Sequence, residues 1–170
     1  MKCKSEKKYP EIRVERKNRY YAELLLSDYA GINGELTAIT RYIFQNFNFF
    51  KEYPKLSEVI AKISMTEMKH LELLGKTIKL LGLEPKFEFK INPYNYSYLY
   101  WNSSYVDYET NIICMLQENI QSEQEVINNY RYDISIIDDK YIKELLERII
   151  EDEKIHIGCF KELLYEFVNN

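Results

Sequence analysis

The sequence has few cysteines, few glycines and no long apolar run. Its three cysteines, Cys3, Cys114 and Cys159, are an odd number without a C-x-x-C pair, which argues against a disulfide framework, a zinc ribbon or an iron–sulfur cluster. We expect them to stay reduced, with Cys114 and Cys159 acting as small apolar residues on helices.

Segments that would direct the chain to a membrane are also missing. No run approaches the roughly 18 apolar residues of a membrane span. The lysines of the opening segment are followed by polar residues, unlike those of a secretion signal. We therefore expect a cytoplasmic protein without a membrane partner.

The charge is nearly balanced. There are 23 Lys and Arg residues against 27 Asp and Glu residues, a net charge of -4, so no strong field exists to gather nucleic acid. A length of 170 residues suits one domain that buries a core without disulfides. The sequence predicts a polar N-terminal segment over residues 1–19 and a single domain over residues 20–170.

Apolar residues recur at three- and four-residue spacing in four segments, which predicts four helices. The first, over residues 20–50, has the stripe Leu25, Ile32, Ile39 and Tyr42. The others run from Leu56 to Leu81, from Ile113 to Ile134 and from Ile142 to Phe167. Gly82 and Pro85 close the second in the expected order.

Residues 84–108 lose this period and carry prolines, tyrosines and Trp101. Strand-like alternation is confined to residues 87–91. Because such aromatic density should pack against something, we expect an ordered crossover, and we favour a contact between subunits of a homo-oligomer over a lid or a binding cleft. Two helical hairpins joined by a long crossover form an all-α four-helix bundle.

Charged residues interrupt the apolar stripes at six positions. Residues three or four apart share a helix face. By this spacing the inward-facing set is Glu35, Glu67, His70, Glu123, Glu153 and His156, whereas Glu118 and Glu125 fall on a solvated face.

Buried carboxylates are costly unless a cation or strong donors balance them. No Lys or Arg falls on the inward stripes near the six residues, whereas two divalent ions would neutralise four carboxylates. The i, i+3 spacing of Glu and His suits the di-iron or di-manganese sites of helical bundles. The alternative is a set of hydrogen-bonded core residues without metal.

The second hairpin repeats the first. Glu123 follows Glu35 by 88 residues, and Glu153 and His156 follow Glu67 and His70 by 86. The repeat predicts a near two-fold site.

Two tyrosines obey the same repeat. Tyr42 and Tyr130 each lie seven residues after their glutamate. For both tyrosines, core packing with a hydroxyl hydrogen bond beside the metals is favoured over a redox or proton-transfer role.

Gly34 falls inside the first expected helix, where it costs about 1 kcal/mol relative to Ala. It could leave room for substrate beside Glu35, or it could allow close helix packing. The sequence does not choose between them.

Four segments of the chain together resemble the ferritin-like superfamily, and in particular its rubrerythrin-like and manganese-catalase-like members. They are residues 34–42, Glu67-Met68-Lys69-His70, Glu123 with Tyr130, and Glu153-Lys154-Ile155-His156. The resemblance implies ferritin-like connectivity and two metal ions. Glu35 and His70 would bind one, and Glu123 and His156 the other. Glu67 and Glu153 would bridge or flank the pair, and Glu153 could instead lie beside the metals as a catalytic proton shuttle.

The resemblance also implies an activity on hydrogen peroxide. Rubrerythrins usually carry C-x-x-C pairs in an electron-delivering domain, and this chain has none. Disproportionation needs no such domain, so we expect a catalase-like oxidoreductase using manganese or iron, which accept the same ligands. The alternatives are a rubrerythrin-like peroxidase, a ferroxidase or iron-binding protein acting on dioxygen with an external electron donor, and a structural coat protein.

Overall fold

Five α-helices make up most of the residues that the structure describes. The computed structural model describes residues 1–91 and 97–169. The elements are α1 (Arg19–Ala30), α2 (Glu35–Phe49), α3 (Pro54–Leu81), β1 (Glu88–Phe89), β2 (Leu99–Tyr100), the 3₁₀ turn η1 (Ser103–Tyr105), α4 (Ile112–Ile136) and α5 (Lys140–Asn169).

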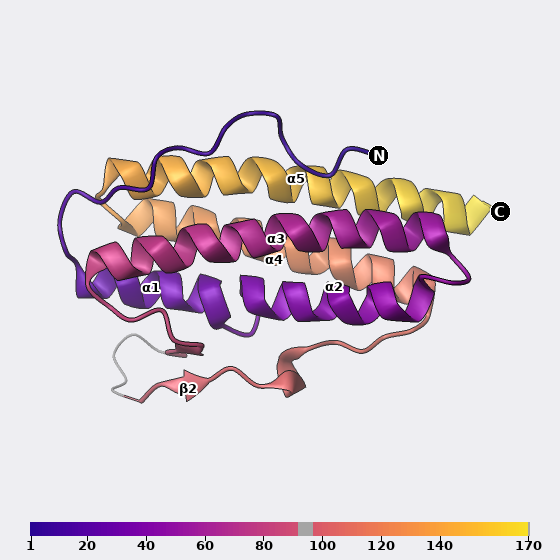
Figure 1. The fold of residues 1–170 in the computed structure, drawn as a ribbon, viewed down its shortest axis with the longest axis horizontal. Helices are drawn as coiled ribbons and strands as arrows, with labels where there is room; N and C mark the ends of the chain where they lie inside the picture. The colour runs from indigo at the N-terminus through magenta and orange to yellow at the C-terminus, as the bar shows by residue number, and fades with distance from the viewer. Residues whose placement is uncertain (92–96, 170) are drawn as a thin grey trace.

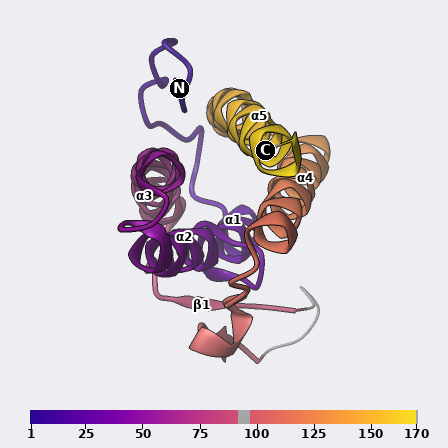
Figure 2. The same ribbon diagram turned by 90° about the vertical axis from the view of Figure 1, so that its right-hand side faces the viewer.

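The helices pack as a four-helix bundle in which α1 and α2 follow one another end to end and together occupy one position (Figure 1). The helix α3 returns beside α2 and α1, and α4 pairs with α5 on the other side (Figure 2). The crossover joins the two hairpins along the outside. The expected all-α four-helix bundle is therefore confirmed.

The first expected helix is broken between Ala30 and Glu35, which the helical period did not predict. The backbone of Gly31 is extended, with ψ at -177°, and that of Gly34, the N-cap of α2, has ψ at 170°. A Cβ atom on Gly34 would lie 2.6 Å from the carbonyl oxygen of Asp28. The structure thus gives a third reason for this glycine, a close approach of backbone in the turn.

This break changes the surroundings of two residues. Ile32, expected in the buried stripe, lies in the turn and is 47% exposed. Glu35 becomes the first residue of α2, where the partial positive charge of a helix N-terminus stabilises a carboxylate.

The ends of α3 match the sequence expectation. Pro54 occupies the start of the helix, where its missing N–H is not needed. Gly82 ends it with φ at 102°, a left-handed conformation that favours glycine.

Two apolar clusters fill the bundle and leave a polar layer between them. On α3, Leu56, Ile60 and Ile63 belong to one cluster, and Leu74 and Ile78 belong to the other. The helices α4 and α5 divide in the same way, and all six candidate ligands fall between the two clusters along the sequence.

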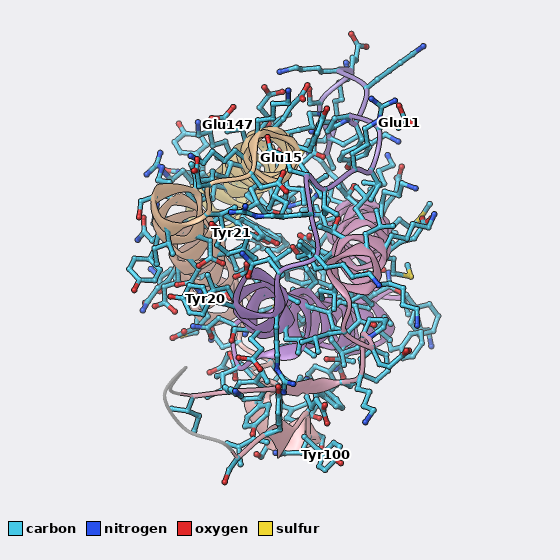
Figure 3. All side chains as sticks on the ribbon, turned by 90° about the vertical axis from the view of Figure 1, so that its left-hand side faces the viewer. Glu11, Glu15, Tyr20, Tyr21, Tyr100 and Glu147 are labelled. Carbon is cyan, nitrogen blue, oxygen red and sulfur yellow. The ribbon has the colours of Figure 1, made fainter. Side chains whose placement is uncertain are left out.

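The crossover packs on the outside of α1 and α2. The indole nitrogen of Trp101 donates to Thr37 Oγ1 at 2.9 Å, and the rings of Phe87 and Tyr29 stack with centroids 5.6 Å apart. Figure 3 shows Tyr100 on its outer side, where it is 70% exposed. Tyr94 and Tyr96 of the expected tyrosine-rich crossover lie outside the described residues, and the expected subunit contact stays a prediction.

Residues 1–18, which we name the N-terminal arm, cross the bundle over α3 and α5 (Figures 1 and 2). Their contacts are specific. Glu15 N donates to Asp139 at 2.7 Å, and the guanidinium of Arg148 donates to the carbonyl oxygen of Lys7 at 2.8 Å. Among the helices that the structure describes, none is long and apolar enough to cross a membrane.

Candidate metal centre

All six candidate ligands point into the polar layer of the bundle, and each is at most 3% exposed. They form two clusters in which one oxygen or nitrogen of each residue lies within 4.8 Å of the others. The first cluster contains Glu35, Glu67, His70 and Glu153, and the second contains Glu67, Glu123, Glu153 and His156.

Glu67 and Glu153 belong to both clusters, and each uses a different oxygen for each. Glu67 places Oε2 2.8 Å from Nδ1 of His70 and Oε1 2.9 Å from Nδ1 of His156. Glu153 places Oε1 2.9 Å from Nδ1 of His70 and Oε2 2.9 Å from Nδ1 of His156. A carboxylate with one oxygen toward each cluster has the geometry of a bridge between two cations.

The other two glutamates each belong to one cluster. Glu35 lies 3.8 Å from Nδ1 of His70, and Glu123 lies 3.9 Å from Nδ1 of His156. The tyrosines bond crosswise between the hairpins. Tyr130 on α4 donates its hydroxyl hydrogen to Glu35, and Tyr42 on α2 donates to Glu123.

Without metal, the carboxyl groups titrate in two different ways. Burial, and then the charge of Glu67, raise the pKa values of Glu35 and Glu123 well above the ordinary range. Burial would raise the pKa values of Glu67 and Glu153 as well. The charges and hydrogen bonds of the two imidazoles outweigh burial, and both pKa values are lowered.

The pKa values of the two histidines are raised in this state. Burial alone would lower their pKa values, but the charges of Glu153 and Glu67 raise the pKa of His70 and of His156 well above the ordinary value. In the metal-free core these shifts favour protons on the two imidazoles and on Glu35 and Glu123, and a metal pair would have to displace those protons.

With protons in place of metal, the carboxylate oxygens beside the two imidazoles do not all receive a hydrogen bond. Each Nδ1 carries one hydrogen but has two carboxylate oxygens at 2.8 to 2.9 Å. Oxygen Oε1 of Glu67 and Oε1 of Glu153 are buried without a hydrogen bond. A buried oxygen lacking a donor is costly, so the donor set fits cations better than it fits protons.

A second layer of residues surrounds His70. Its Nε2 lies 3.2 Å from Asp152 Oδ2, and Asp152 also accepts from the Tyr9 hydroxyl at 2.6 Å and from the Ser5 N–H at 2.7 Å. The buried guanidinium of Arg148 lies 2.8 Å from the same carboxylate. Burial would raise the pKa of Asp152, but these hydrogen bonds, that of His70 first, lower it to about 2.

The sequence did not predict this layer. Arg148 is a buried cation beside this layer, 2% exposed, and it pairs with Asp152 rather than with any of the six candidate ligands. The i, i+4 spacing of Arg148 and Asp152 beside Glu153 is a signal that could have indicated an ion pair. Tyr9 lies in the polar N-terminal segment and carries no comparable signal.

Comparison with known proteins agrees with this geometry. A model of the Rubrerythrin family matches residues 29–164, a range that includes all six candidate ligands. The chain therefore belongs to the rubrerythrin family, as the resemblance of its motifs indicated.

Individual relatives point in the same direction. A protein named "Probable manganese catalase" from Clostridium acetobutylicum is 29% identical over 174 residues, which cover 94% of this chain and 76% of that protein. The crystal structure of KatB, a manganese catalase from Anabaena, superposes with a TM-score of 0.83 at 23% identity, covering 98% of this chain and 81% of that chain. A bacterioferritin from Desulfovibrio desulfuricans gives a TM-score of 0.71 at 23% identity, with 89% and 85% covered. These two likenesses show a common fold, and the expected ferritin-like connectivity is confirmed.

Proposed function

We propose that this protein holds two metal ions and disproportionates hydrogen peroxide into dioxygen and water. Glu35 and His70 would bind one ion, Glu123 and His156 the other, and Glu67 and Glu153 would bridge them. The observation that carries this proposal is the sharing of Glu67 and Glu153 between the two clusters, with one oxygen of each residue toward each cluster.

A bound redox-active pair would supply the storage of two electrons between one peroxide molecule and the next. The protein would supply the ligands, the exclusion of bulk water and the handling of protons. Oxidation of one peroxide releases two protons, and reduction of a second consumes two. Each turnover therefore needs groups that can hold protons near the substrate.

Glu35 and Glu123 each accept a hydrogen bond from a tyrosine hydroxyl, which fixes the position of the carboxyl group. The geometry favours a bridging role for Glu153 over the proton-shuttle role that the sequence left open. Burial would raise the pKa of the Glu153 carboxyl, but the charges and hydrogen bonds of the two imidazoles outweigh it and lower this pKa.

The similarity to a probable manganese catalase favours manganese as the metal. Catalase-like disproportionation needs no separate electron donor. The test is dioxygen release from hydrogen peroxide, measured with an oxygen electrode on manganese-loaded protein without added reductant.

Matched variants separate the site from the rest of the helix surface. We expect Glu123→Ala to lose metal and activity, because its carboxylate belongs to one cluster, and Glu67→Ala to lose both metals. Glu118→Ala removes an exposed glutamate from the same helix as Glu123 and should retain full metal content and activity.

Three results would replace this proposal. Peroxide consumption only with iron and a reducing partner would indicate a rubrerythrin-like peroxidase. Iron oxidation by a protein that forms a large, cage-sized particle would indicate an iron-storing protein, and light scattering measures the particle size. A fully metal-loaded protein without any turnover would favour a structural role.

A further inference from the structure

Two cysteines from opposite ends of the chain meet beside the metal centre. Cys3 lies on the N-terminal arm and Cys159 on α5, three residues after His156. Their Sγ atoms are 3.6 Å apart, and the Cys159 thiol donates to Cys3. Both side chains are buried, whereas Cys114 is exposed on α4.

We propose that Cys3 and Cys159 form a disulfide when the protein meets hydrogen peroxide, and that this bond tethers the N-terminal arm to α5. The two sulfur atoms need to approach from 3.6 Å to about 2.0 Å. The arm has no helix in residues 1–18, so Cys3 can move toward Cys159 without disturbing a helix.

Peroxide can reach Cys3 from outside the bundle. A cavity of about 850 Å³ lies along the arm, and Cys3, Lys62, Lys69 and Thr66 are among the residues that line it. Cationic surroundings favour the thiolate, which is the nucleophilic form of cysteine. The hydrogen bond from Cys159 is the largest cause of the lowered pKa of Cys3, which falls to about 7.

The chemistry balances with peroxide as the oxidant. The Cys3 thiolate attacks one peroxide oxygen, the O–O bond breaks, and Cys3 becomes a sulfenic acid while hydroxide takes up a proton to form water. The Cys159 sulfur then attacks the sulfenic sulfur, and a second water leaves with the Cys159 proton. Two thiols and one peroxide give one disulfide and two waters.

The tether would act on the layer of residues around His70. Ser5 and Tyr9, on the same arm as Cys3, both donate to Asp152, which lies beside His70. Fixing the arm at Cys3 would hold these donors in place. We therefore expect oxidation to slow the loss of metal from the centre.

The test treats full-length protein, metal-loaded and chelator-treated, with stoichiometric hydrogen peroxide. Trypsin should then yield the peptide of residues 3–4 linked to that of residues 155–161, with free thiols falling from three to one. Cys114→Ser should form the same link, and Cys3→Ser should not. Because the link does not require turnover, its formation in chelator-treated protein separates this inference from the proposed catalase activity.

Two further readouts measure the tether itself. We expect the oxidised protein to melt roughly 5 °C or more above the reduced protein, since a disulfide closing most of the chain restricts the unfolded state. Its manganese should pass to a chelator several-fold more slowly. Dithiothreitol should reverse both effects, and Cys3→Ser should show neither.

Oxidation of Cys114 before the buried pair, a link between two chains, or sulfinic acid at Cys3 without a link would each overturn the inference. Unchanged free thiols after peroxide treatment would do the same. If Cys159→Ser proves unstable because its side chain is buried, Cys3→Ser on the arm still decides the outcome.

Discussion

The two halves of the candidate metal centre are near copies on the inside and different on the outside. Inside, each half has one imidazole, one unshared glutamate and a tyrosine hydroxyl from the opposite hairpin. Outside, Nε2 of His70 bonds to Asp152, while Nε2 of His156 has no hydrogen-bond partner among the described residues.

The internal repeat locates the origin of this difference. Subtracting the offset of 86 from 152 gives position 66, so the counterpart of Asp152 is Thr66. The Thr66 hydroxyl donates instead to the carbonyl oxygen of Lys62 in its own helix, at 3.2 Å. The second half thus lacks the carboxylate that orients an imidazole from outside.

The N-terminal arm increases the asymmetry. Its Tyr9 ring packs 6.0 Å from the ring of His70 and its hydroxyl bonds to Asp152. The comparison shows that a repeated sequence can keep the ligands of two half-sites alike while a segment outside the repeat makes their surroundings unequal.

Removing both metals should change the melting temperature more than any substitution does, and it tests the similarity of the ligands inside the two halves. Binding to the folded state alone contributes about 4 kcal/mol per site when free metal is 1,000 times Kd. Chelation should therefore lower the melting temperature by roughly 8–16 °C per site. Differential scanning calorimetry measures this shift, with Glu67→Ala as the variant expected not to respond. A melting curve that stays unchanged after confirmed metal removal would favour the metal-free core.

The pH dependence should have opposite signs in the two states. Without metal, the raised pKa values of Glu35 and Glu123 stabilise the fold at low pH, and this stability is lost as pH rises above about 4.3. The raised pKa values of the two histidines likewise stabilise the fold, and this stability is lost as pH rises above about 6.5. The lowered pKa values of Glu67 and Glu153 act only at acid pH, where their contribution is lost as pH falls. Bound metal instead requires deprotonated ligands. The difference in melting temperature between loaded and metal-free protein should therefore widen between about pH 5 and 8.

Substituting the residues outside the imidazoles tests the asymmetry directly. Asp152→Asn should weaken binding at the His70 half by about 10–100-fold, because partners that orient a ligating imidazole carry that much affinity. Thr66→Val, the matched change in the other half, should leave manganese affinity within about twofold. Titration followed by metal analysis should find one weakened and one unchanged ion per chain in Asp152→Asn. Equal weakening of both ions would contradict the assignment.

The smallest effect is expected at the tyrosines, where the halves are alike. Tyr130→Phe and Tyr42→Phe each remove one hydroxyl that donates to a buried carboxyl group. Each should lower the free energy of unfolding by about 1–3 kcal/mol, measured by urea titration of metal-free protein. The two losses should match, and a loss in only one variant would show that the inner similarity is incomplete.

Helical period predicted which glutamates and histidines face inward, because that direction depends only on spacing within one helix. It failed at Gly31 and Gly34, where the chain leaves the helix for a turn that depends on a close backbone approach to Asp28. The three- and four-residue spacing of apolar residues also predicted that Ile32 lies in the core, although the turn exposes it.

The sequence by itself determined the four-helix bundle and the inward-facing set of Glu35, Glu67, His70, Glu123, Glu153 and His156, since local spacing and the repeat encode both. Only the tertiary structure decided that Glu67 and Glu153 are shared, that Asp152 orients one imidazole, and that Cys3 meets Cys159. These contacts join residues 82 to 156 positions apart. Such pairings depend on how helices and arm pack in space, and the period of a single helix carries no information about them.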